Sequence, residues 1–197
     1  MGRDGKDREV FARGIRNSVG LAFRPGTGEL WFTDTDPNGL GDDLPPGEVN
    51  RADRPGLHFG FPWYAGGRVR TPGYLGGEPP AGAVFPVAET APHATDLGPV
   101  FYEGGMFPAG YRGALFGAQR GSSVRRAGPV GARVTVTFLA PDGSARGHRP
   151  FAEGWLDAAT GRYRGRIADV AVLPDGSLLV SDDEAGALYR VTYHGPR

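Results

Sequence analysis

The sequence contains no cysteine, which excludes disulfide bonds, thiolate metal sites and cysteine nucleophiles. It has no net charge, and no basic block interrupts it, so nucleic acid is not an expected partner. No apolar run approaches the ~20 residues that span a bilayer, and we expect no membrane span. The first eight residues are charged and lack the apolar core of a signal peptide, so the chain as written is expected to stay in the cytoplasm.

Recognisable hydrolase and metal motifs are also missing. No G-x-S-x-G segment is present to supply a nucleophilic serine on a strand-to-helix turn. The histidines show none of the close spacing that a helical metal site requires. They are His58, His93, His148 and His194.

Glycine and proline, by contrast, are abundant, with 34 and 18 copies that make up about a quarter of the chain. No stretch free of both exceeds nine residues, so a helix of average length has no place to form. Aromatic residues reach 11%, which is more than a disordered segment carries. We therefore predict an all-β protein with many turns.

Several segments show the pattern of strands joined by tight turns. Residues 133–138 alternate apolar and polar side chains, and residues 188–193 are rich in strand-forming types. Turns are predicted at residues 25–28, 141–143 and 174–176, where proline, aspartate and glycine interrupt apolar runs.

An internal repeat joins the two ends of the chain. Residues 19–34 match residues 169–182, with Asp34 and Asp182 in equivalent places, and a weaker copy lies at residues 111–118. The spacing suits three blades of a β-propeller. Trp31 and Trp155 are expected to pack in the core or between blades. Three blades alone leave two open flanks, so we expect a fragment or one half of an assembly.

Six segments, in order, resemble the soluble glucose/sorbosone dehydrogenases that depend on pyrroloquinoline quinone (PQQ). They are residues 14–23 (GIRNSVGLAF), 33–46, 58–63 (HFGFPW), 93–98 (HATDLG), 107–116 (FPAGYRGALF) and 165–191. The resemblance implies the C-terminal half of a six-bladed β-propeller spanning residues 1–197. Its blades are expected near residues 14–64, 93–140 and 150–194, with long loops at 37–48 and 62–92.

That family transfers a hydride from a sugar to PQQ, with Ca²⁺ polarising the cofactor. The resemblance therefore implies a small sugar substrate, PQQ and Ca²⁺, and it assigns roles to particular residues. Cofactor binding falls to Arg16, Asn17, Arg120 and Arg166; calcium binding to Asp36, Pro37, Asp42 and Asp43; and the substrate pocket to His93.

The sequence also departs from the family pattern. The catalytic base of the family is expected upstream of Met1, so this chain carries no catalytic residue and is expected to be inactive alone. Arg120 stands where sorbosone-type members have histidine, and Asp36 replaces a glycine. Family members are usually periplasmic or secreted. The expected partner is a complementing N-terminal half or a second copy in a homodimer.

Each assignment has a simpler alternative. Arg16 and Asn17 form a turn pair in that reading, and Asp42 with Asp43 forms a solvated acidic turn. Arg166 then pairs with Asp169 or Asp182 at the surface, and His93 is a surface residue. For the whole chain, the alternative is a non-catalytic propeller that works by binding. A propeller lactonase is disfavoured, because no Glu/Asp/Asn set for its calcium recurs across the blades.

Overall fold

The structure is a computed structural model that describes residues 2–122 and 124–195. Within these residues the regular elements are β-strands and two short 3-10 helices, η1 (Pro72–Tyr74) and η2 (Ala109–Tyr111), with no α-helix. No helix in this part of the chain is long and apolar enough to cross a membrane. The predicted all-β class is confirmed, because glycine and proline interrupt every segment before a helix can extend.

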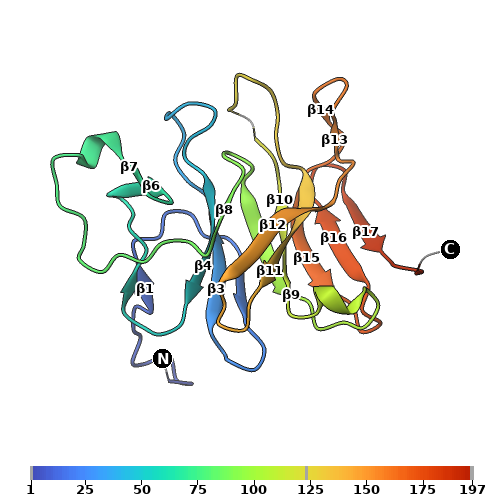
Figure 1. Ribbon diagram of the computed structural model, residues 1–197, viewed down its shortest axis with the longest axis horizontal. Helices are drawn as coiled ribbons and strands as arrows, with labels where there is room; N and C mark the ends of the chain where they lie inside the picture. Colours follow the sequence, from blue (N-terminus) through green and yellow to red (C-terminus); the bar gives the residue numbers. More distant parts are fainter. Residues whose placement is uncertain (1, 123, 196–197) are drawn as a thin grey trace.

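Three antiparallel sheets follow one another along the chain and across the molecule (Figure 1). In each sheet the strands are hydrogen-bonded in chain order, from an inner strand to an outer one. The first sheet contains β2 (Leu21–Phe23), β3 (Leu30–Asp34), β4 (Gly47–Ala52) and β8 (Ala88–Thr90); the second β9 (Asp96–Phe101), β10 (Leu115–Gln119), β11 (Arg133–Leu139) and β12 (Ala145–Ala152); the third β15 (Ile167–Val172), β16 (Leu178–Asp182) and β17 (Ala187–Val191).

The described residues also form three two-stranded sheets. β1 (Ala12–Arg13) lies parallel to β5 (Leu57–His58), while β6 (Tyr64–Gly66) pairs with β7 (Val69–Arg70) and β13 (Leu156–Asp157) with β14 (Arg162–Tyr163). Ala12 of β1 and Leu57 of β5 pack in one hydrophobic cluster with Phe32 of β3 and with Phe59.

The sheets pack face to face through apolar side chains. Trp31 and Val49 of the first sheet meet Phe101 and Leu115 of the second. A larger cluster, which includes Phe116 and other core residues, joins the second sheet to the third. The inner strand β9 contacts β2 and β3 on one side and β15 on the other. Sheets that pack face to face in sequence, with their first strands on the inside, are the blades of a partial β-propeller, as predicted.

The predicted strands and turns are largely confirmed. β11 and β17 occupy the two segments singled out by pattern, and the three predicted turns join β2 to β3, β11 to β12 and β15 to β16. Trp31 is fully buried between sheets, and Trp155 packs edge-on against Tyr189 with ring centroids 5.4 Å apart.

The expected loops and blade limits differ from the observed sheets. Residues 62–92 include β6, β7, η1 and β8, and β4 begins at Gly47 within the expected loop 37–48. The sheets span 21–90, 96–152 and 167–191, so β12 closes the second sheet and does not open the third. Outer strands such as β12 are largely solvent-facing and contain charge, glycine and proline, which hides their alternation.

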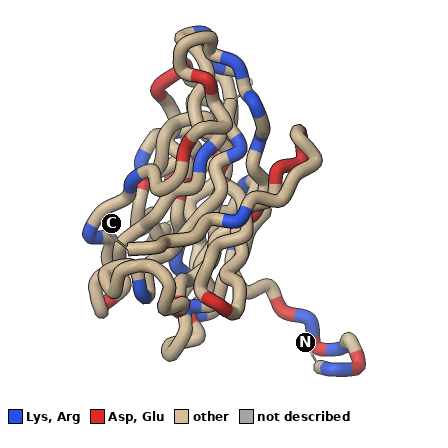
Figure 2. Tube along the Cα trace, turned by 90° about the vertical axis from the view of Figure 1, so that its right-hand side faces the viewer, with Lys and Arg blue, Asp and Glu red and all other residues tan. Residues whose placement is uncertain are grey.

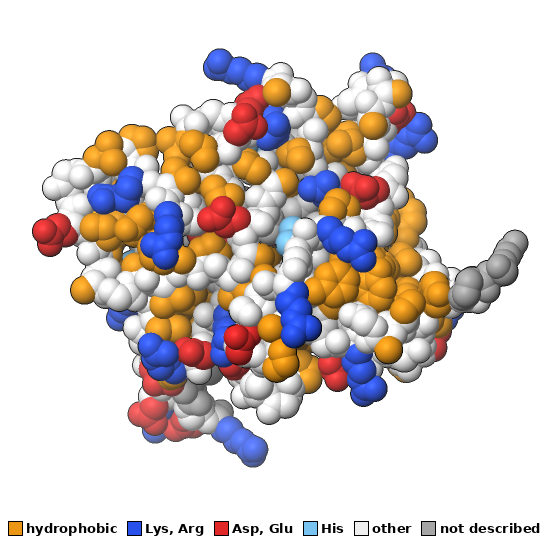
Figure 3. All heavy atoms as spheres, viewed as in Figure 1, with side chains coloured by type: hydrophobic (Ala, Val, Ile, Leu, Met, Phe, Trp, Pro, Cys, Tyr) orange, Lys and Arg blue, Asp and Glu red, His pale blue; other side chains and the backbone are white. Residues whose placement is uncertain are grey.

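Charged residues of both signs are interspersed along the chain trace (Figure 2). On the face shown in Figure 3, positive and negative side chains are mixed with each other and with hydrophobic ones. This distribution accords with the zero net charge of the sequence.

Candidate functional site

The predicted site residues gather at one edge of the three sheets. Arg16 and Asn17 precede β2, His93 precedes β9 and Arg166 precedes β15. Because neighbouring strands are antiparallel, the start of each inner strand lies beside the end of the second strand. The segments that follow β3, β10 and β16 therefore reach the same edge.

Two buried aspartates hold the arginine-bearing segments in place. Asp34 Oδ2 accepts a hydrogen bond from the Arg16 backbone N–H (2.9 Å), and Asp34 Oδ1 accepts one from the Asn17 N–H (2.6 Å). In the third sheet, Asp182 Oδ1 accepts from the Arg166 N–H at 2.9 Å. Asp34 and Asp182, which occupy equivalent positions of the sequence repeat, thus make the same kind of contact in the first and third sheets. Sequence reasoning gave neither aspartate this role, although their matched positions were the available signal.

Replacing Asp34 by alanine should therefore loosen the Arg16 segment. Burial raises the pKa of Asp34, while the backbone hydrogen bonds from Arg16 and Asn17 oppose that rise. Losing both hydrogen bonds leaves two backbone N–H groups without their partner. We therefore expect the free energy of unfolding to fall by about 2–3 kcal/mol. Urea unfolding measures this, with Asp183→Ala at an exposed position as the control. An Asp34→Ala protein as stable as the control would contradict the clamp.

A polar cavity of about 200 Å³ brings four predicted residues together. Its lining contains Arg16, Asn17, Asp36 and His93, together with Thr35, Asn38, Thr95, Ser122 and Val124. A neighbouring cavity of about 430 Å³ shares His93 and includes Asp42. Residues from the first and second sheets thus line a common space, although they lie far apart in the sequence.

The second-sheet wall of this cavity has an unusual backbone. His93 and Thr95 both adopt left-handed conformations, with φ of +61° and +59°. A β-branched residue such as threonine rarely does so, and strain of this kind is concentrated at functional sites. His93 Nε2 lies 2.7 Å from the Gly41 carbonyl oxygen, which fixes the ring between the two cavities. Thr95 was not predicted, because composition and spacing carry no sign of a left-handed threonine.

The three predicted arginines are in different states. The Arg16 guanidinium donates to the Thr35 carbonyl at 2.7 Å, and among the described residues it makes no ion pair. Arg120, by contrast, is bound to the Asp183 carboxylate. An exposed, unpaired arginine at a cavity is the one most available to an anionic ligand.

Arg166 lies next to the cavity without lining it. Its Nη2 donates to the Gly121 carbonyl at 3.1 Å, and Thr95 Oγ1 donates to the same oxygen at 3.1 Å. The guanidinium also lies 4.0 Å from Glu184. Asp182 receives the Arg166 backbone N–H and is not its side-chain partner. Arg16 and Arg166 therefore flank the same 121–122 segment.

Carboxyl groups crowd beneath the cavity. Burial, reinforced by the charges of Glu48 and Asp34, raises the pKa of Asp36 to about 10. Burial likewise raises the pKa of Glu48 to about 7, despite hydrogen bonds from Asn50 and the Gly67 N–H. Asp36 Oδ2 is buried and has no hydrogen-bond partner among the residues that the structure describes. This region favours either protons or a cation.

The other predicted calcium residues are engaged elsewhere. The Asp42 carboxylate accepts backbone N–H groups from Arg126 (3.0 Å) and Ala127, and these bonds lower its pKa. Asp43 lies 3.7 Å from Arg125 in an ion pair. Within residues 2–122 and 124–195, no three His, Cys, Asp or Glu side chains converge as a metal site. The calcium role of Asp36, Pro37, Asp42 and Asp43 stays a prediction.

Comparison with known proteins places this arrangement in context. Among curated proteins, an uncharacterized protein of Borreliella burgdorferi is 36% identical over 190 residues, covering 95% of this chain and 50% of that protein. Aldose sugar dehydrogenase YliI of Escherichia coli is 28% identical over 195 residues, covering 95% and 45%. The chain thus spans about half the length of the curated relatives it matches.

Solved structures share the fold. A glucose dehydrogenase crystal structure matches with a TM-score of 0.68 at 27% identity, covering 98% of this chain and 50% of that one. The PQQ-bound aldose sugar dehydrogenase of Streptomyces coelicolor gives a TM-score of 0.56 at 23% identity, covering 93% and 44%. The profile of one family, "Glucose / Sorbosone dehydrogenase", matches residues 1–190. This chain belongs to the glucose/sorbosone dehydrogenase family.

Proposed function

We propose that this chain supplies one half of a PQQ pocket in a sugar dehydrogenase, and that it does not oxidise sugar by itself. The observation that carries the proposal is the convergence of Arg16, Asn17, Asp36 and His93 on one polar cavity. Family membership and the PQQ-bound relative from Streptomyces support the choice of cofactor. An aldose or a sorbosone-like sugar is the proposed substrate of the complete enzyme.

The residues present fit an anionic, planar cofactor. Arg16 offers an unpaired guanidinium, and Asn17 adds an amide beside it. Arg166 would reach the same ligand from the third sheet, next to Gly121. Arg120 would first have to leave Asp183, which makes it the weakest of the proposed contacts. When bound, PQQ would supply the quinone that accepts the hydride from the sugar.

Calcium fits this place through charge and oxygen donors. The buried Asp36 oxygen and the buried carboxyls near it offer oxygen donors to a hard cation, which would displace the proton that the raised pKa of Asp36 retains there. Its protein ligands would include the backbone carbonyls of Asp36 and Pro37, because no three acidic or histidine side chains of the described residues meet there. Asp42 and Asp43 would first have to release the 125–127 loop, which both already contact.

Arg16→Ala should weaken PQQ binding by about 10- to 100-fold, the effect of losing one charge-assisted contact. Calorimetry or fluorescence quenching with PQQ and Ca²⁺ measures this on the purified chain. Arg112→Ala is the matched control, because Arg112 is exposed and lies 4.0 Å from Glu103 in a surface ion pair. Equal affinities for the two variants would contradict the assignment.

The same samples test the expected inactivity. With PQQ, Ca²⁺ and an electron-accepting dye, the chain should show no aldose oxidation, since none of its residues is assigned as the base. Measurable aldose oxidation by the isolated chain would refute the expected inactivity. Failure to bind PQQ even after reconstitution with the complementing N-terminal half would favour the non-catalytic interaction module.

A further inference from the structure

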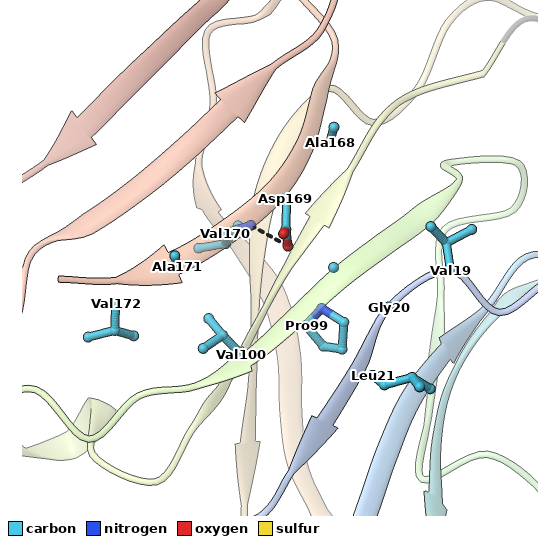
Figure 4. Close-up of a pocket in the computed structure, with 11 residues that line it drawn as sticks. Val19, Gly20, Leu21, Pro99, Val100, Ala168, Asp169, Val170, Ala171 and Val172 are labelled. Carbon is cyan, nitrogen blue, oxygen red and sulfur yellow. Dashed lines mark hydrogen bonds between the residues drawn. The ribbon is translucent and has the colours of Figure 1, made fainter. Parts of the chain in front are cut away.

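Tyr163 lies where the chain crosses from the second sheet to the third. It ends β14, which pairs with β13 in the hairpin between β12 and β15. The two sheets are adjacent along their inner strands, and Figure 4 shows β9 with Val100 beside β15 with Val170. A residue of this hairpin can therefore contact the cavity wall in the second sheet as well as Arg166 at the start of the third.

The Tyr163 hydroxyl joins two segments of that wall. It accepts a hydrogen bond from the Ser122 N–H at 2.8 Å, and it lies 2.8 Å from the Val130 carbonyl oxygen and 3.0 Å from the Ser122 carbonyl oxygen. Since a phenol has a single proton, it donates to one of these two oxygens at a time. Ser122 lines the polar cavity, whereas Tyr163 lies outside its lining. The hydroxyl thus fixes a cavity residue from outside the cavity.

The Tyr163 ring packs against the backbone of Gly121. A Cβ atom at position 121 would lie only 2.8 Å from the ring, closer than Cβ atoms approach other heavy atoms. Gly121 also has a φ of +106°, which residues with side chains rarely adopt. Its carbonyl oxygen accepts hydrogen bonds from Arg166 Nη2 and Thr95 Oγ1, both at 3.1 Å. The ring therefore helps to set the position of an oxygen that two residues of the site share.

The Arg166 guanidinium lies over the same ring. Arg166 Cζ is 5.4 Å from the ring centroid, within the range of a cation–π contact. Together with the Gly121 carbonyl and with Glu184 at 4.0 Å, the ring leaves the guanidinium few alternative positions. An arginine that is ordered in advance loses less side-chain freedom when it binds an anion.

We propose that Tyr163 is a positioning residue of the PQQ pocket. Its hydroxyl holds Ser122 in the cavity wall, and its ring holds the Arg166 guanidinium beside the Gly121 carbonyl. The inference rests on the proposed function, because it takes the polar cavity and Arg166 as the cofactor site. All of these contacts lie between the second and third sheets, both of which the chain contains.

Two substitutions separate the hydroxyl from the ring. Tyr163→Phe removes the hydroxyl and keeps the ring, and with Ca²⁺ present it should raise the dissociation constant for PQQ by about 3- to 10-fold, the effect of losing one hydrogen bond. Tyr163→Leu should raise it by a further ~3-fold through the lost cation–π contact. Fluorescence quenching measures both on the purified chain and after reconstitution with the complementing N-terminal half. Tyr74→Phe and Tyr74→Leu, at a 44% exposed position outside the cavity, are the matched controls and should bind PQQ as the wild type does.

An Arg166→Ala background distinguishes positioning from a purely structural role. Without the guanidinium the ring has no cation to hold, so Tyr163→Phe and Tyr163→Leu should then bind PQQ equally. If the further loss caused by Tyr163→Leu persists in full, the ring acts through general packing and the proposal is overturned. Equal PQQ affinities of the wild type and both Tyr163 variants would also overturn it, while leaving the proposed function intact.

Hydrogen exchange of the cofactor-free chain tests the hydroxyl contact without PQQ. In Tyr163→Phe the Ser122 amide keeps only its longer bond to the Val130 carbonyl, at 3.1 Å. NMR should find that this amide exchanges at least about 5-fold faster than in the wild type. Unchanged exchange would overturn the proposal. A wild-type protein that binds no PQQ, alone or reconstituted, would instead contradict the proposed function and this inference together.

Discussion

Trp31→Ala should destabilise the protein by about 3–5 kcal/mol, the usual range for deleting a buried tryptophan side chain. Trp31 is 0% exposed and lies between the first and second sheets, where it packs against Phe101. Alanine would leave a cavity at the joint between two wedges, not inside one of them. Urea unfolding at fixed protein concentration measures the loss.

Trp31→Phe serves as the matched comparison for this change. Phenylalanine keeps an aromatic ring against Phe101 and removes the buried indole N–H, for which the described part of the chain offers no hydrogen-bond partner. We expect a cost of about 1–2 kcal/mol, mainly from the lost volume. An alanine variant that loses less than the phenylalanine variant would show that this joint contributes little to stability.

The architecture could be predicted because it is repeated. The match between residues 19–34 and 169–182 marks the β2–β3 and β15–β16 hairpins, and the equivalent aspartates prove to be equivalent in contact as well. Turn residues placed the hairpins, because glycine and aspartate determine turn geometry locally. Outer strands such as β8 and β12 escaped prediction, since few of their side chains are buried and their sequences carry little periodicity.

The site was predicted through resemblance more than through physical pattern. Arg16, Asn17, Asp36 and His93 do line one cavity, yet nothing in their spacing indicates that residues 16 and 93 approach each other. Their proximity depends on how the first sheet packs on the second. Packing between sheets also determines which arginine is engaged in an ion pair. Arg120 meets Asp183 because the second and third sheets are adjacent. Contacts between sheets are long-range, and local sequence does not encode them separately.

The buried acidic residues next to the site lead to a final prediction, which concerns how the stability of the protein depends on pH. Burial raises the pKa of Asp96 from 3.8 to about 6, although hydrogen bonds from Thr90 and Gln119 Nε2 (2.9 Å) partly oppose the rise. Between these two pKa values the folded protein holds a proton that the unfolded chain has released. The free energy of unfolding therefore falls as pH rises from 4 to 6, by about 3 kcal/mol for a difference of about two units.

Asp96→Asn should remove this part of the pH dependence. Asparagine stays neutral, and it can still accept a hydrogen bond from Gln119 and donate one to Thr90. Between pH 4 and 7, the free energy of unfolding of the variant should therefore fall by about 3 kcal/mol less than that of the wild type. Asp175→Asn is the control, because hydrogen bonds from Ser177 lower the pKa of exposed Asp175 and place its effect below pH 4. Urea unfolding at several pH values measures both slopes. Asp36 and Glu48, whose pKa values burial raises to about 10 and about 7, should leave a residual decline in the Asp96→Asn protein. If the wild-type and Asp96→Asn slopes coincide, then Asp96 does not ionise in a buried place, and the joint between β8, β9 and β10 is more open to water than its packing indicates.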